Sequence, residues 1–326
     1  MSNKLTSSVL DLIKAYIASG IFPGASFAIV SDDVVTKYAL GNRQIKPETH
    51  PLMPNERYDL ASVSKVVGTG TVVLDLILAG SLSLDSLLTD YYPEFMGGAV
   101  TIRQLMTHTS GIDPFIKGRN EMDAVQLRAA LNQVNVTSDK SFHYSDVNFI
   151  LLGFMLETIF SQSLDVILSE RIFVPFGMTH TSFSGEGAVP TAWELPRGLV
   201  HDPKAQVLGV HTGSAGLFSD LDDLAKFCQG YFSEARYLSL LSDFTLEDGK
   251  RRSLAWDIYD NVENTENSEI SWLLHTGYTG TFILLNLRTK EAVIFLSNRV
   301  HLRDERQKWI AERDRLIQAF VAMFEK

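Results

Sequence analysis

Strand-forming and helix-forming patterns are segregated along this chain, and their order restricts the fold more than any other feature. β-rich runs lie near both ends, at residues 24–30 and 34–41 and again at 271–277, 280–287 and 291–298. Helical spacing dominates between them, and amphipathic helices precede the first run and follow the last. If the terminal runs share one antiparallel sheet, the fold is α+β. A sheet domain with terminal helices (1–60 and 216–326) then carries an inserted, mostly helical domain (61–215), with the active site expected in the cleft between them.

Charge and cysteine content exclude several classes of protein. The 326 residues carry a net charge of -10, which disfavours nucleic acid and anionic membrane surfaces as partners. Cys228 is the single cysteine, so no intrachain disulfide forms and no metal site is indicated; we expect a buried helix residue. The N-terminal segment has helical rather than secretory-signal character, and the apolar run 72–80 is short and contains Asp75. We therefore expect a soluble, cytoplasmic protein without a membrane span, whose oligomeric state the sequence leaves open.

The segment Ser-Val-Ser-Lys at 62–65 opens a helix predicted to run to about Ala79, with Gly80 as its C-terminal cap. A serine hydroxyl needs a nearby base to act as a nucleophile. Ser62 and Lys65 can share one helix face, although this spacing also occurs by chance. Gly68 and Gly70 each cost roughly 1 kcal/mol relative to Ala. They are either tolerated defects or positions where another element packs tightly against a buried helix.

Two later segments offer further polar groups. In His-Tyr-Ser-Asp (143–146), Tyr144 could relay a proton and Asp146 could hold Lys65 or orient a substrate. The alternative is that Tyr144 is a packing residue and Asp146 a helix N-cap. The segment His-Thr-Gly at 275–277 ends one β run; a strand edge there can donate N–H groups to an oxyanion, or the segment is only a hairpin turn. A helix near 220–232 is expected, with Ser219 as its N-cap.

Together, these motifs in this order resemble the serine β-lactamase and penicillin-binding protein superfamily, in its class C-type branch, which includes cytoplasmic esterases. The resemblance covers most of the chain and includes the segments 105–112, 143–153, 208–220 and 296–301. It implies a β-lactamase-like fold and an acyl-enzyme mechanism without metal or cofactor. It implies the following roles: Ser62 as nucleophile, Lys65 as general base or proton shuttle, Tyr144 in proton transfer, the backbone N–H groups of Ser62 and Tyr278 as oxyanion hole, and Asp146, His275, Thr276 and Gly277 in substrate binding.

Two positions depart from the usual family pattern. Position 275 more often carries lysine, and a histidine there attracts a substrate carboxylate less and has a charge expected to vary near neutral pH. Position 146 more often carries asparagine, and Asp146 cannot donate a hydrogen bond to a substrate carbonyl but could hold Lys65 charged. A second His-Thr-Gly at 211–213 precedes a helix and is interpreted as a cleft-lining or structural loop, and His108 as a buried structural histidine.

These departures weigh against efficient β-lactam hydrolysis and fit an esterase or a peptidase-like relative at least as well. The function expected from the sequence is a serine hydrolase of carboxylic esters or small amides. A β-lactamase or a D-Ala-D-Ala carboxypeptidase-like penicillin-binding protein is the first alternative. A catalytically idle member that binds a peptide or metabolite in the same cleft is the alternative from another class. The expected partner is accordingly a small-molecule ester, amide or β-lactam.

Overall fold

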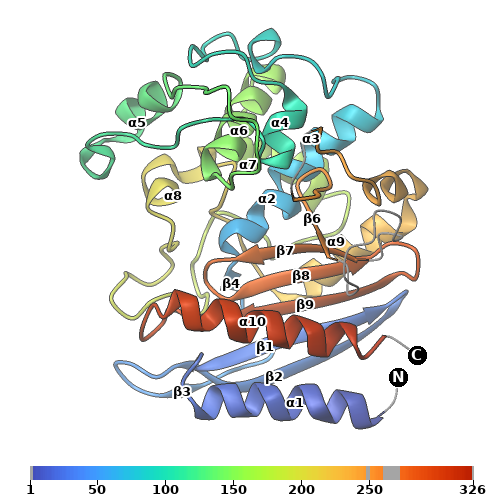
Figure 1. Cartoon of the computed structure of the whole chain (residues 1–326). Coiled ribbons are helices and arrows are strands. Elements are labelled where there is room, and N and C mark those ends of the chain that lie inside the picture. Colours follow the sequence, from blue (N-terminus) through green and yellow to red (C-terminus); the bar gives the residue numbers. More distant parts are fainter. Residues whose placement is uncertain (1–2, 247–249, 260–271, 325–326) are drawn as a thin grey trace.

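A computed structural model describes residues 3–246, 250–259 and 272–324 of the chain. Its main element is a seven-stranded antiparallel sheet in the order β3-β2-β1-β9-β8-β7-β6, so strands from both ends of the sequence pair directly through β1 and β9 (Figure 1). Together with the flanking helices, this confirms the predicted α+β class, with an antiparallel sheet and terminal helices. The strands are β1 (Gly24–Ser31), β2 (Val34–Gln44), β3 (His50–Pro51), β6 (Asp257–Tyr259), β7 (Trp272–Gly277), β8 (Thr281–Asn286) and β9 (Glu291–Ser297). Ser271, the first residue of one predicted run, lies outside the described residues.

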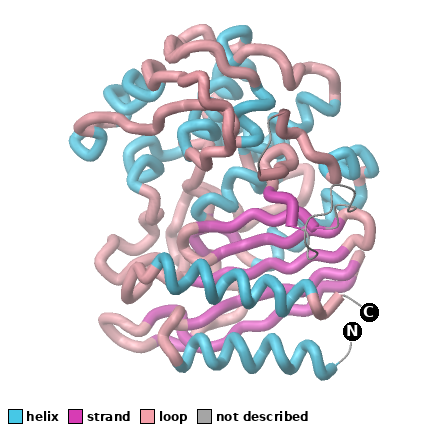
Figure 2. The backbone as a smooth tube through the Cα atoms, viewed as in Figure 1, coloured by secondary structure: helices cyan, strands magenta, loops and turns pink. Residues whose placement is uncertain are grey.

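Both faces of the sheet are covered, which explains the nearly continuous apolar runs of its central strands. Along β1, Phe27 and Ile29 pack into one hydrophobic cluster, while Ala28 and Val30 belong to another on the opposite face. The first face carries the two terminal helices, α1 (Asn3–Ala18) and α10 (Arg306–Val321), which lie side by side across the sheet. On the second face, α9 (Leu221–Ser233) packs on β1 and β9. Figure 2 shows the sheet in magenta with the terminal helices across it.

The remaining helices gather beyond the β7 side of the sheet (Figure 1). Their centre is α6 (Asp146–Phe160), in which every residue from Val147 to Leu156 is buried. Packing from all sides explains why α6 lacks a polar stripe. Around it lie α2 (Ser64–Val67), α3 (Thr69–Leu78), α4 (Ile102–Thr107), α5 (Ala124–Leu131), α7 (Leu164–Leu168) and α8 (Pro203–Leu208). The domain boundaries proposed from the sequence stay a prediction.

The helix predicted over 62–79 is not continuous. It begins as a 3-10 turn, η1 (Ala61–Val63), continues as α2, and breaks at Gly68 before α3. The two glycines mark tight packing rather than tolerated defects: a Cβ on Gly68 would lie 2.9 Å from Leu168 Cδ1, and one on Gly70 would lie 2.7 Å from a backbone oxygen. Farther along, the N-cap of α9 is Asp220 and not Ser219, because the Asp220 side chain accepts the N–H of Asp223.

One window of the described residues, Ala61–Leu78, is long and apolar enough to cross a bilayer, but 72% of it is buried inside the fold. A second candidate, Asp146–Phe160 with Leu164–Phe173, is bent by 82° at its break. Helices at the centre of a packed core have the same length and composition, so this pattern is weak support for a membrane span.

Candidate active site

Ser62 and Lys65 meet as the sequence predicts. Ser62 lies in η1 with its side chain partly exposed, whereas Lys65, one turn later in α2, is fully buried. The Lys65 ammonium donates to Ser62 Oγ at 2.9 Å, to Asp146 Oδ1 at 2.7 Å and to the carbonyl of Ser214 at 2.9 Å. An ammonium has three N–H donors, so all three are used. The arrangement fixes the serine hydroxyl against a buried cation.

Asp146 is the counter-ion of that cation. Its Oδ2 also forms an ion pair with Lys204 Nζ at 3.1 Å, and Lys204 is 3.2 Å from Asp202. Burial by itself lowers the pKa of Lys65, but the charge of Asp146 and the nearby Tyr144 outweigh burial and raise it. Burial by itself raises the pKa of Asp146. The positive charges of Lys65 and, to a smaller extent, Lys204 outweigh burial, so the pKa of Asp146 is lowered. Both shifts keep the Lys65–Asp146 pair charged at neutral pH.

The local chain explains how Asp146 reaches Lys65. The N-cap of α6 is Ser145, whose Oγ accepts the N–H of Val147 at 3.2 Å, and Asp146 is the first helical residue. The interpretation of Asp146 as a simple N-cap is therefore wrong. Tyr144 lies two residues before Asp146 and is 44% exposed, with its ring centroid 5.1 Å from Lys65 Nζ and 4.5 Å from the ring of His108. The structure thus brings Tyr144 beside the lysine.

The His-Thr-Gly segment at 275–277 lies against the turn that carries Ser62. A Cβ on Gly277 would lie 2.5 Å from the carbonyl of Leu60 and 3.4 Å from Ala61 Cβ, so only glycine allows β7 to approach η1 this closely. From the next strand, the Thr281 hydroxyl donates to the Leu60 carbonyl at 2.9 Å. The end of β7 and the Ser62 turn are therefore fixed relative to one another.

His275 is 2% exposed, and neither ring nitrogen has a hydrogen-bond partner among the described residues. Burial first, and then the charge of Lys65, lowers the pKa of His275 to about 3. The expectation that its charge varies near neutral pH is consequently not met, because the ring is already neutral there. Thr276 accepts a hydrogen bond from Arg313 of α10 at 3.4 Å.

Sequence reasoning missed Lys204, which is far from Ser62 in the chain and has no local signal, and Ser214, although Ser214 lies in the 208–220 segment. Ser214 directly follows the second His-Thr-Gly, so this loop contributes a carbonyl to Lys65.

His108 is fully buried, and its Nδ1 accepts the Ser145 N–H at 3.3 Å and lies 2.9 Å from Asn148 Nδ2. These bonds agree with a structural role for His108.

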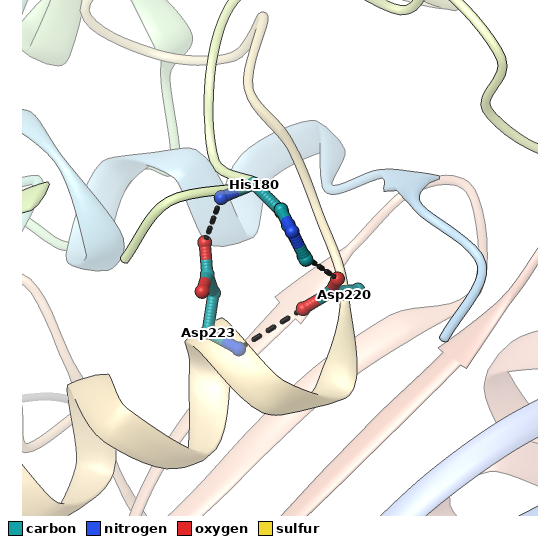
Figure 3. Close-up of side chains that lie close together, drawn as sticks. All are labelled: His180, Asp220 and Asp223. Carbon is teal, nitrogen blue, oxygen red and sulfur yellow. Dashed lines mark hydrogen bonds and ion pairs between the residues drawn. The ribbon is translucent and has the colours of Figure 1, made fainter. Parts of the chain in front are cut away.

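One cluster of the described residues has the composition of a metal site: His180, Asp220 and Asp223 (Figure 3). Its carboxylates already have partners. Asp223 accepts from the backbone N–H groups of Thr179 and His180 and from the Thr181 hydroxyl, and Asp220 accepts from His180 Nδ1 and caps α9. The cluster therefore joins the 179–181 loop to the N-terminus of α9.

Comparisons with known proteins identify the family of the chain. The Beta-lactamase family model matches residues 9–317. A putative D-alanyl-D-alanine carboxypeptidase of Salmonella agona (strain SL483) is 29% identical over 310 residues, covering 77% of this chain and 72% of that protein. The solved structure of EstCE1, a hydrolase with promiscuous acyltransferase activity, has a TM-score of 0.77 at 17% identity, covering 96% of this chain and 98% of that chain. A class C beta lactamase has a TM-score of 0.78 at 19% identity, covering 98% of each chain.

Fold and family together define a serine hydrolase of the β-lactamase and penicillin-binding protein superfamily. The chain belongs to the Beta-lactamase family.

Proposed function

We propose that this protein hydrolyses carboxylic esters or small amides through an acyl-enzyme on Ser62. The observation that carries the proposal is the 2.9 Å hydrogen bond between Lys65 Nζ and Ser62 Oγ, in a partly exposed turn next to Tyr144. Ser62 Oγ attacks the substrate carbonyl carbon, and the backbone N–H groups of Ser62 and Tyr278 hold the oxyanion. The leaving group departs with a proton, and water then hydrolyses the acyl-enzyme.

Proton transfer follows from the charge state of the site. In the resting site Lys65 is an ammonium, so it orients Ser62 and can accept the serine proton only after losing its own. Tyr144 lies beside Lys65 and is the group through which that proton leaves. The reaction therefore speeds up as the pH rises, until Lys65 is neutral in the substrate complex.

Two features favour esters. Asp146 offers no N–H donor to an amide side chain, and both its oxygens are held by lysines. His275 is neutral and buried, so it supplies no positive charge for the carboxylate of a penicillin or a peptide C-terminus. Esters also have the better leaving group and need less assistance from either position.

One observation favours the second candidate, a β-lactamase or carboxypeptidase. Arg313 Nη1 lies 3.4 Å from Thr276 Oγ1, which places a cation near the end of β7, although Arg313 also pairs with Asp314 at 2.7 Å. A substrate carboxylate that displaced Asp314 would gain a bidentate partner there.

The test is turnover and intact mass after incubation with a short-chain nitrophenyl ester, nitrocefin or penicillin, for wild type and Ser62→Ala. We expect ester turnover that Ser62→Ala abolishes. Nitrocefin turnover would favour a β-lactamase instead, and a stable penicillin adduct a penicillin-binding protein. If wild type neither turns over nor forms an adduct with any of these probes, or with a fluorophosphonate, the chain is an idle ligand-binding member and the proposal is wrong.

A further inference from the structure

Asp59 is a buried carboxylate that lies just before the nucleophile turn and that the proposed chemistry does not use. It ends the short strand β4 (Tyr58–Asp59), which pairs with β5 (Phe218–Ser219), and it is 3% exposed. Its Oδ1 accepts the N–H of Ala61 at 2.8 Å, and its Oδ2 accepts the N–H of His201 at 2.7 Å. Each carboxylate oxygen thus holds a different segment of the chain.

The first of these segments is under backbone strain. Ala61 has φ +46°, in the left-handed region that residues other than glycine, asparagine and aspartate seldom occupy. Such a conformation persists only where the surroundings impose it. The hydrogen bond from the Ala61 N–H to Asp59 is one such restraint, and the backbone N–H of Ser62 follows directly after Ala61. Asp59 therefore helps set where the first oxyanion donor points.

The second segment leads to the other proposed oxyanion donor. The His201 ring stacks on the ring of Tyr278, with centroids 5.0 Å apart and planes at 23°. The backbone carbonyl of Asp59 also accepts the Thr279 hydroxyl at 2.8 Å. Both contacts connect Asp59 to the turn that carries the Tyr278 N–H.

We propose that Asp59 is a positioning residue that fixes the Ser62 turn relative to the Tyr278 turn, so that the two backbone N–H groups converge on one acyl oxygen. The inference rests on the proposed function, because it concerns the oxyanion site of that reaction. It assigns Asp59 no contact with substrate. Its effect is expected on kcat, since an oxyanion donor acts mainly in the transition state.

The hydrogen bonds also make the arrangement sensitive to pH. A protonated carboxyl group turns one acceptor oxygen into a donor, which can no longer accept from a backbone N–H. Burial raises the pKa of Asp59 to about 6. The hydrogen bonds from the two N–H groups lower this pKa, and the negative charge of Asp202, next to His201, raises it. Asp59 thus weakens its hold on one segment as the pH falls through about 6. The other groups that contact Asp59 are uncharged: Phe218, its partner on β5, and Thr279.

The experiment compares Asp59→Asn with wild type in ester hydrolysis from pH 4 to 9. An asparagine keeps the shape but presents an NH₂ to one of the two N–H groups. We expect kcat to fall at least about tenfold with KM within about twofold, and the loss of activity near pH 6 to disappear. Asp123→Asn is the matched control, because Asp123 also accepts a backbone N–H, from Gln126 at 2.8 Å, on the exposed end of α5. It should match wild type.

An unchanged kcat in Asp59→Asn overturns the inference. A lower kcat overturns it as well if the variant still loses activity near pH 6 as wild type does. If Asp59→Asn does not fold, Thr279→Val decides: it removes only the bond to the Asp59 carbonyl and should lower kcat while retaining the pH limb. A Thr279→Val enzyme with wild-type kcat overturns the inference as well. Failure of the proposed function looks different, since wild type itself would then match Ser62→Ala.

Discussion

Replacing Asp146 by asparagine tests whether one carboxylate controls the reactivity of this site. The substitution removes the negative charge 2.7 Å from Lys65 Nζ and keeps an amide oxygen that can accept the same hydrogen bond. Lys65 then stays fully buried with Lys204 as a nearby cation, and both conditions disfavour its ammonium form. We expect the pKa of Lys65 to fall.

The size of the fall follows from the geometry. Two unit charges 2.7 Å apart attract by about 6 kcal/mol at an effective dielectric constant of about 20. Each pKa unit corresponds to about 1.4 kcal/mol, so the upper limit is about four units. Lys204 already shares the carboxylate, and the asparagine oxygen recovers part of the attraction. We therefore expect the pKa of Lys65 to fall by about two units. At a pH below that pKa, the fraction of neutral Lys65 then increases by up to about a hundredfold.

The assay is kcat/KM for a nitrophenyl ester as a function of pH, for wild type, Asp146→Asn and the control Asp222→Asn. Asp222 also pairs with a lysine, Lys37 at 2.6 Å, but on the surface. The rise in kcat/KM that depends on Lys65, which is distinct from the change near pH 6 assigned to Asp59, should move to lower pH in Asp146→Asn alone, with higher kcat/KM at pH 7. A limb that stays in place, or a lower kcat/KM at pH 7 with unchanged thermal stability, would refute the role assigned to Lys65 and Asp146.

The same pair has a consequence for acid stability. Against the opposing effect of burial, Lys65 and Lys204 hold the pKa of Asp146 below its usual value, so the pair stabilises the fold above pH about 4 and this stabilisation is lost as the pH falls further. Urea unfolding from pH 6 to 2 should therefore show a steeper loss of stability for wild type than for Asp146→Asn, and equal slopes would contradict this.

Three further predictions concern other residues. Gly277→Ala places a Cβ 2.5 Å from the Leu60 carbonyl, so we expect a cost of about 1–3 kcal/mol in urea unfolding and a loss of about a hundredfold in kcat. Gly20→Ala, with φ +73° but no atom near its Cβ, should lose stability and keep kcat. An active Gly277→Ala would show that β7 and η1 need not approach closely. His275→Lys should speed acylation by penicillin at least about tenfold and shift the pH profile, because the new ammonium attracts the carboxylate and lowers the pKa of Lys65; an unchanged profile would exclude His275 as a specificity position. Cys228 is fully buried and burial raises its thiol pKa, so iodoacetamide should modify it only in urea; rapid labelling of the native protein would contradict this.

The fold was predictable because its determinants are periodic and local. The nearly continuous apolar run of β1 and the 3.6-residue spacing in α1 and α10 can be recognised from neighbouring residues, and the position of the β runs at both chain ends indicated a shared sheet. The errors occur where tertiary contacts decide. The helix breaks at Gly68, where Leu168, a hundred residues later, leaves no room for a Cβ. The residue that caps α9 in place of Ser219 is Asp220, which also contacts His180.

The sequence predicted that Ser62, Lys65 and Asp146 meet and that Lys65 is charged, but not the other charges of the site. Motif spacing brought Ser62 to Lys65, and the asparagine-to-aspartate departure at 146 suggested that Lys65 is held charged. The number of cations that share this carboxylate depends on where α8 packs, and no local pattern marks Lys204 as part of the site. The same holds for His275: its sequence position suggests a group that titrates near neutrality, whereas full burial beside an ammonium makes it neutral. A motif specifies which atoms can meet, but their protonation depends on burial and on partners that are distant in the chain, and here these decide which group can act as the base.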